Sequence, residues 1–174
     1  FRIADTDQTM MMDLITRTVQ EHGSDKHYIL PSIPNHLYAE DCCEPGIPLG
    51  MGLESYEWVC IPDTETILIL ATYEEELYSI KDRFVSESRN LLFNPEDDEM
   101  TDEIHSADNV IVMMTLDHFQ QSILSRSSRI SSILYVGAGF TDQYRFTIRR
   151  RKEIKSDQGV FYQKGRNQVI KLAL

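Results

Sequence analysis

The sequence predicts a single α/β or α+β domain over residues 1–174, with a mixed sheet, about three flanking helices and an antiparallel C-terminal strand meander. Two observations lead to this prediction. Three apolar runs, at residues 66–73, 110–116 and 133–138, alternate with helix-like segments, which is the βαβαβ pattern of buried parallel strands. The last third of the chain then holds short runs of β-branched and aromatic residues, separated by glycine-bearing turns.

The N-terminal part is predicted to begin with a helix over residues 7–22, where apolar residues recur at helical spacing before Gly23. A short strand over residues 27–30 follows and stops at Pro31. Residues 31–55 hold four prolines and three glycines without any period, so we expect an irregular loop that packs over the domain. Residues 56–61 then read as a strand.

A second helix is predicted over residues 74–89, with Thr72 as its N-cap and three glutamates in its first turn, where they favour the positive end of the helix dipole. Its expected buried stripe consists of Leu77, Ile80, Phe84, Val85 and Leu91. Residues 94–108 are dense in like charges that repel one another, so we expect an exposed, mobile acidic loop.

Asp117 is predicted to cap a third helix over residues 118–129, with Phe119, Ile123 and Ile130 facing inward. After the apolar strand at residues 133–138, three further strands are expected. They begin at Tyr144, Val160 and Asn167, and glycine-bearing turns separate them.

Charge divides the chain into two parts. Residues 1–120 hold 6 Lys and Arg against 25 Asp and Glu, whereas residues 121–174 hold 11 against 3. The balances are −19 and +8, within a net charge of −11 for the whole chain. Such an asymmetry indicates either one face that meets a charged partner or two halves that attract each other.

The candidate binding site is the basic segment of the C-terminal part. Alternation from Tyr144 places Phe146 and Ile148 on one face, so the chain leaves the core near Arg150 and its tip projects into solvent. The alternatives are a solvated edge protected by cations and an internal pairing with the acidic residues 96–99. The residues of the predicted binding site are Arg149, Arg150, Arg151, Lys152, Lys155, Lys164 and Arg166.

Motifs for chemistry are weak. The Val136-Gly-Ala-Gly-Phe140 turn lacks the third glycine and the following helix of a dinucleotide site, so a tight turn is the preferred interpretation and no cofactor is predicted. Cys42, Cys43 and Cys60 lack metal-site spacing, so we expect buried free thiols and no metal. The five histidines are scattered, and the Pro62-Asp63 and Glu153-Ile-Lys155 pairs are spaced too far apart for a nuclease signature.

These observations favour a non-catalytic protein-interaction domain of a larger intracellular protein, cytoplasmic or nuclear, which binds a partner or a second copy of itself through an exposed strand. The first alternative is nucleic-acid binding through the Arg149–Lys155 hairpin, and the second is an enzyme with an unrecognised site. No run is long enough in apolar residues to span a membrane, so no membrane partner is expected.

Overall fold

The computed structural model describes residues 32–79, 89–139, 154–163 and 165–173. By its internal contacts the chain divides into two compact units, Phe1–Ser32 and Ile33–Leu174, and the fold described below is that of the second unit. The predicted helix over residues 7–22, the strand over 27–30 and the strand that begins at Tyr144 lie outside the described residues. A single domain over the whole chain therefore stays a prediction.

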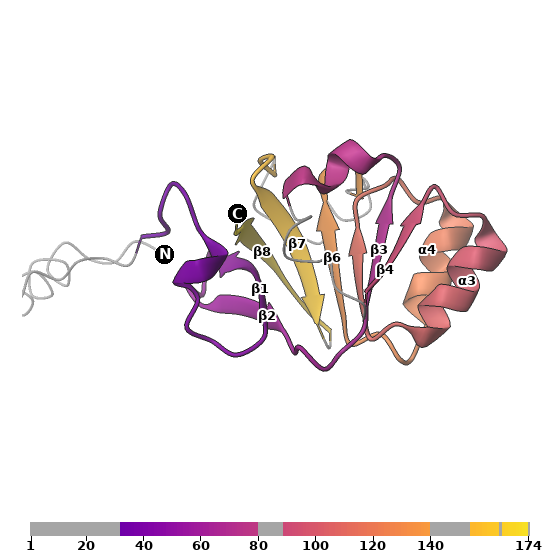
Figure 1. Cartoon of the computed structure of the whole chain (residues 1–174), viewed down its shortest axis with the longest axis horizontal. Coiled ribbons are helices and arrows are strands. Elements are labelled where there is room, and N and C mark those ends of the chain that lie inside the picture. The colour runs from indigo at the N-terminus through magenta and orange to yellow at the C-terminus, as the bar shows by residue number, and fades with distance from the viewer. Residues whose placement is uncertain (1–31, 80–88, 140–153, 164, 174) are drawn as a thin grey trace, which may run out of the picture. The chain divides into compact units, whose positions relative to one another are not determined.

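The described strands form one eight-stranded sheet in the order β2-β1-β8-β7-β6-β5-β3-β4 (Figure 1). β3 pairs in parallel with β4 and β5, and β5 pairs in parallel with β6. The other neighbouring pairs are antiparallel, which confirms a mixed sheet within an α/β or α+β fold. The strands are β1 (Ile47–Gly52), β2 (Trp58–Ile61), β3 (Ile67–Ala71), β4 (Arg89–Phe93), β5 (Asn109–Val112), β6 (Ser132–Val136), β7 (Gln158–Gln163) and β8 (Arg166–Leu172).

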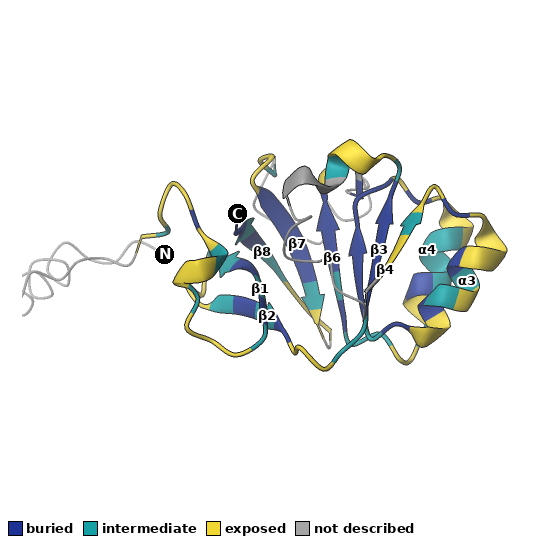
Figure 2. Cartoon of the chain, viewed as in Figure 1, coloured by how far each residue is buried: buried dark blue, intermediate teal, exposed yellow. Residues whose placement is uncertain are grey.

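The central strands are buried on both faces, as their apolar runs predict. All residues of β3 and β5 are buried (Figure 2). On one face, Leu68 and Val110 pack with side chains of the helices. On the other face, Ile69 and Ile111 belong to the same apolar cluster as Leu49 of β1. Because β1 is four places from β5 in the strand order, the sheet must curl over this second face to bring them together.

A helix replaces the predicted mobile acidic loop over residues 94–108. Helix α3 spans Asp97–Ser106, and its apolar residues Met100 and Ile104, followed by Ala107, are buried against the sheet. The prediction was wrong because three apolar residues at helical spacing are enough to anchor one face. The acidic residues of the first turn favour the helix, since they lie at the positive end of its dipole.

Helix α4 (His118–Arg126) begins where the sequence predicts. The side chain of Asp117 accepts a hydrogen bond from the backbone N–H of Gln120 at 2.8 Å, and the Gln120 side chain accepts one from the N–H of Asp117 at 3.2 Å. This is a complete capping box, and it confirms the predicted N-cap. The helix ends three residues earlier than predicted, and Phe119, which was expected to face inward, is 57% exposed.

The predicted irregular loop over residues 31–55 contains the short 3-10 turn η1 (Ala39–Asp41) and the whole of β1. The sequence did not predict this strand, because proline and glycine both have low strand propensity. The pairing of β1 with β2 is irregular between Pro48 and Gly50, which is where a strand tolerates proline. A Cβ atom at Gly50 would lie 2.1 Å from the carbonyl oxygen of Lys171 in β8, so this close approach requires glycine.

The predicted helix over residues 74–89 is described only at its two ends. Glu74–Ser79 form the 3-10 turn η2, and Arg89 begins strand β4, which was not predicted. The Glu76 carboxylate accepts hydrogen bonds from the backbone N–H groups of Thr72 and Tyr73, at 2.8 and 3.3 Å. Leu91, which was expected in a buried helical stripe, lies on β4 and is 39% exposed.

At the C-terminal end, β7 and β8 form the predicted antiparallel hairpin, and β7 also pairs antiparallel with β6. Gly165 has a φ of 78° in the turn between the two strands. The Gly137–Gly139 segment forms the short 3-10 turn η3 after β6, and a Cβ atom at Gly139 would lie 2.2 Å from the carbonyl oxygen of Val112. The close approach to Val112 therefore explains Gly139, and a φ of 54° explains Gly137.

Candidate functional site

Strand β4 is the terminal strand of the described sheet, and its outer edge is the candidate site (Figure 1). The N–H of Asn94 donates to the carbonyl oxygen of Ala71 in β3 at 2.8 Å. Because main-chain groups of alternate residues point to the same side of a strand, those of Leu92 and Asn90 also face β3. The N–H and C=O groups of Leu91 and Phe93 therefore point away from β3, to an edge that no other described strand occupies, where they offer a template for another strand.

The side chains of β4 differ between its two faces. Asn90 donates a hydrogen bond to the Glu103 carboxylate of α3, and Leu92 packs against the helix-side core. By strand alternation, Leu91 and Phe93 lie on the opposite face, where they are 39% and 45% exposed. Tyr73, which follows β3, is 64% exposed. One face of this edge is therefore apolar, and the other lies beside α3.

Helix α3 makes the helix-side face of this edge acidic. Its acidic residues are Asp97, Asp98, Glu99, Asp102 and Glu103, and its sequence holds neither Lys nor Arg. A pocket of about 290 Å³ lies beneath it, lined by side chains of β3, β4 and α3 that include Asn90 and Glu103. We call β4 together with α3 the β4–α3 edge. It combines backbone groups that pair with no other described strand, exposed apolar side chains and negative charge.

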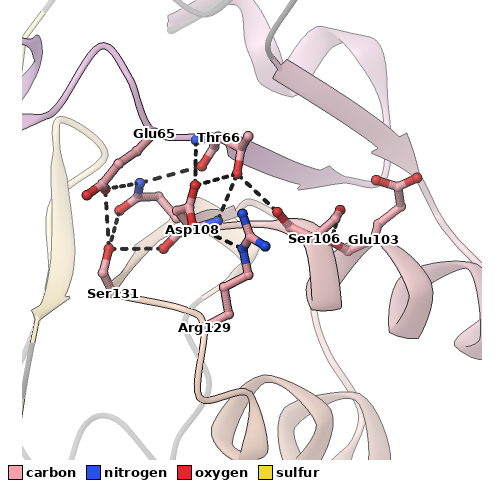
Figure 3. A network of polar contacts seen from close by, with 8 residues as sticks. Glu65, Thr66, Glu103, Ser106, Asp108, Arg129 and Ser131 are labelled. Carbon is pink, nitrogen blue, oxygen red and sulfur yellow. Dashed lines mark hydrogen bonds and ion pairs between the residues drawn. The ribbon is translucent and has the colours of Figure 1, made fainter.

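A polar network joins the segments that lead into the parallel strands (Figure 3). The Asp108 carboxylate accepts hydrogen bonds from the backbone N–H of Thr66 at 3.0 Å, from the Thr66 hydroxyl at 2.9 Å and from Arg129 Nε at 3.0 Å. The Ser131 hydroxyl donates to the carbonyl oxygen of Asp108 at 3.0 Å. The Thr66 N–H bond, with smaller contributions from the Thr66 hydroxyl and Arg129, lowers the pKa of Asp108.

We interpret this network as structural. Thr66, Asp108 and Ser131 immediately precede β3, β5 and β6, so the network lies at the amino ends of the parallel strands. Ligand sites of open parallel sheets lie at the opposite, carboxyl ends. Among the residues that the structure describes, no group of three or more His, Cys, Asp and Glu side chains is placed to hold a metal ion.

The three cysteines are free thiols in different surroundings. Cys42 follows η1, and its Sγ atom lies 3.6 Å from Sγ of Cys60 in β2. Both side chains are half-buried, whereas Cys43 is exposed, so the prediction of a buried thiol was wrong for Cys43. Burial, followed by the neighbouring Cys42 thiol, raises the pKa of Cys60 to about 12.

Most of the predicted basic site lies outside the described residues. This applies to Arg149, Arg150, Arg151, Lys152 and Lys164. Lys155 and Arg166 are exposed, but Lys155 precedes Gln158 at the start of β7, and Arg166 is paired with Gln163 at the end of that strand. The two described members therefore lie at opposite ends of the β7–β8 hairpin and do not form one cluster.

The sequence interpretation missed the β4–α3 edge. The run Arg89-Asn-Leu-Leu-Phe93 is a short apolar segment next to a helix-like pattern, and periodicity alone does not distinguish a strand from a helix over so few residues. The sequence does contain one indication of a strand here. Phe93 favours a strand, and the adjacent Asn94-Pro95 favours a turn after it.

No protein-family model matches this chain, and neither does any curated protein. Within the described residues, no helix has both the length and the apolar character that crossing a bilayer requires.

Several solved structures are similar in part, among them the following three. The cytoplasmic domain of EssC shares 12% sequence identity at a TM-score of 0.39, over 93% of this chain and 51% of that one. The cytoplasmic domain of the Thermomonospora curvata type VII secretion ATPase EccC shares 12% at a TM-score of 0.41, over 83% and 28%. EssC (ATPases 2 and 3) from Geobacillus thermodenitrificans shares 11% at a TM-score of 0.38, over 93% and 50%. The chain spans about half of these structures or less, and similarity at this level indicates neither family nor function.

Proposed function

We propose that this chain is a non-catalytic protein-interaction domain whose β4–α3 edge takes up an extended segment of a partner protein as an additional strand. The observation that carries the proposal is the outer edge of β4, where no other described strand pairs and outward-facing backbone groups lie beside the exposed side chains of Leu91 and Phe93. Strand addition pairs those backbone groups and covers the apolar side chains in one step.

The two faces of β4, one apolar and one beside the acidic helix α3, define which side chains the partner segment should carry. Successive side chains of an added strand point to opposite faces, so one set meets Leu91 and Phe93 and the other meets α3. The first set is expected to be apolar, because it covers exposed apolar side chains. The second set is expected to be Lys or Arg, because it lies beside a helix with five acidic residues. The partner segment therefore alternates apolar and basic residues.

A second copy that adds its own β4 is a poorer occupant. Pairing of two β4 strands about a two-fold axis applies the same surface to both sides of the interface. The acidic helices α3, each adjacent to its β4, would then approach one another and repel. We therefore propose a partner with a basic segment in place of self-association through β4.

We place the domain in an intracellular protein, because three free thiols suit a reducing compartment. Nucleic-acid binding remains the alternative for the basic residues 149–155. Within the described part of the chain, Lys155 and Arg166 lie at opposite ends of the hairpin, which gives that alternative no continuous phosphate-binding surface.

The test measures binding of a labelled nine-residue peptide of alternating Val and Lys by fluorescence anisotropy. Saturable binding is expected, and it should weaken with salt because the charges are exposed. Leu91→Pro removes an outward-facing N–H without removing a hydrogen bond to β3, so the fold should persist as judged by circular dichroism. Loss of one main-chain hydrogen bond should weaken binding by up to about tenfold.

Charge-matched variants distinguish binding at the β4–α3 edge from a general attraction of the basic peptide to the negatively charged domain. Glu99→Gln with Glu103→Gln neutralises two residues of α3, whereas Glu54→Gln with Glu57→Gln neutralises two exposed glutamates between β1 and β2. Only the first pair should weaken binding several-fold. Equal binding of a Val–Glu peptide, or binding unchanged by Leu91→Pro, would contradict the proposal.

A further inference from the structure

We propose that Cys42 and Cys60 are a modification site, a thiol pair that closes reversibly into an intramolecular disulfide when hydrogen peroxide oxidises Cys42. The geometry points to this pair because the two Sγ atoms are 3.6 Å apart and already in contact. Formation of a bond of about 2.05 Å requires the two sulfurs to approach by about 1.5 Å in total. This site does not overlap the β4–α3 edge, because β2 lies at the other end of the described sheet.

The surroundings give the two thiols different roles. Cys42 follows η1 and has extended backbone angles, with φ −78° and ψ 122°. It lies in the segment before β1 and is held by no strand pairing. Cys60 is fixed in β2, opposite Pro48 of β1, and burial and the Cys42 thiol keep it protonated by raising its pKa to about 12. We assign Cys42, in the segment outside the strands, as the sulfur that meets the oxidant, and Cys60, fixed in β2, as the one that resolves it.

The reaction has two balanced steps. The sulfur of Cys42 attacks one peroxide oxygen, the O–O bond breaks, and water leaves as Cys42 becomes a sulfenic acid. The sulfur of Cys60 then attacks the sulfur of Cys42, the S–O bond breaks, and the departing oxygen takes up the Cys60 proton and leaves as a second water. Two thiols and one peroxide therefore give one disulfide and two waters.

The disulfide would close a covalent loop between positions 18 residues apart around β1. Such a loop restricts the unfolded chain, and it also ties the segment after η1 to β2. The oxidised protein should therefore melt about 5–10 °C higher than the reduced one. Glutathione or another small thiol should reverse the change by thiol–disulfide exchange.

The experiment treats the reduced full chain with hydrogen peroxide, blocks the remaining thiols with iodoacetamide and measures intact mass and peptide maps. The expected product is a monomer with one Cys42–Cys60 bond and one alkylated cysteine, Cys43. Cys43→Ser is the matched control and should still close, because Cys43 is exposed and belongs to no sulfur contact in the described residues. Cys60→Ser should stop at a Cys42 sulfenic acid, which dimedone traps.

Cys42→Ser and Cys42→Ala should both abolish closure, and circular dichroism shows whether each remains folded. The proposal is overturned if the mapped bond contains Cys43, if it links two chains, or if three alkylated cysteines remain after peroxide treatment that oxidises free cysteine under the same conditions. It is also overturned if Cys60→Ser yields no trapped Cys42 sulfenic acid. Binding of the alternating peptide to β4 is a separate measurement, so neither result determines the other.

Discussion

Asp108 joins three segments that are distant in the sequence. It holds Thr66 before β3 through two hydrogen bonds and Arg129 after α4 through a third. Its own N–H donates to the Thr66 hydroxyl at 2.9 Å. The carboxylate therefore matters for stability mainly as a hydrogen-bond acceptor, and its negative charge strengthens each bond.

We predict that Asp108→Asn lowers the free energy of unfolding by about 1–2 kcal/mol at pH 7, because its amide group must face one of these donors. The folded-state pKa of Asp108 is lowered below the ordinary value of 3.8, so this stabilisation is present above that pH. It is lost as pH falls through the folded-state pKa. Urea unfolding of both proteins between pH 7 and pH 2.5 should show the difference shrink below about pH 4.

Asp63→Asn is the control for that experiment, because it makes the same change at an exposed position in the loop before β3. It should change the unfolding free energy by no more than about 0.5 kcal/mol at pH 7. A difference between wild type and Asp108→Asn that stays constant to pH 2.5 would contradict the proposed role of the carboxylate.

At the scale of one element, α3 shows that a strongly acidic segment can still be part of the core. Four of its five acidic residues are exposed, and Glu103 lies against β4, while Met100 and Ile104 are fully buried. One helix therefore supplies both the acidic face of the proposed binding edge and much of the cover over β3 and β5.

We predict that Met100→Ala lowers the free energy of unfolding by about 2–5 kcal/mol, because it leaves a cavity in the helix-side core. Asp102→Ala, at an exposed position of the same helix, should change it by about 0.5 kcal/mol or less. Denaturant unfolding measures both. Similar values for the two variants would mean that α3 is not packed as described.

At the scale of the whole molecule, the acidic charge bears on its association state. We predict a monomer at micromolar concentration in physiological salt, since contact between two β4–α3 edges is repulsive. Multi-angle light scattering at several concentrations and salt levels is the measurement. A dimer that Leu91→Pro dissociates would show that a second copy occupies the edge.

The parallel centre of the sheet was predictable from the sequence, because residues 66–73 and 110–116 are near-continuous apolar runs. Such runs are typical of parallel strands that are buried on both faces of a sheet. The cap at Asp117 was predictable because it depends only on Gln120, three residues away. Both features rest on local patterns.

The proposed site was not predictable, because its character depends on long-range order. Nothing within residues 89–93 indicates that β3 is the one described strand that pairs with β4, nor that α3 lies beside it. Strand β1 was missed for a related reason. Pro48 and Gly50 read as breakers, and only the backbone of β8, more than 100 residues later, explains the glycine.

The place of β1 between β2 and β8 has a consequence for how the protein is made. The ribosome releases β1 and β2 long before β8, which is the last strand of the sheet to emerge. Until then the early hairpin has no neighbour on its inner side, and a two-stranded ribbon is barely stable alone. The nascent chain therefore carries this hairpin without a strand on its inner side until residues 166–172 emerge and pair with β1.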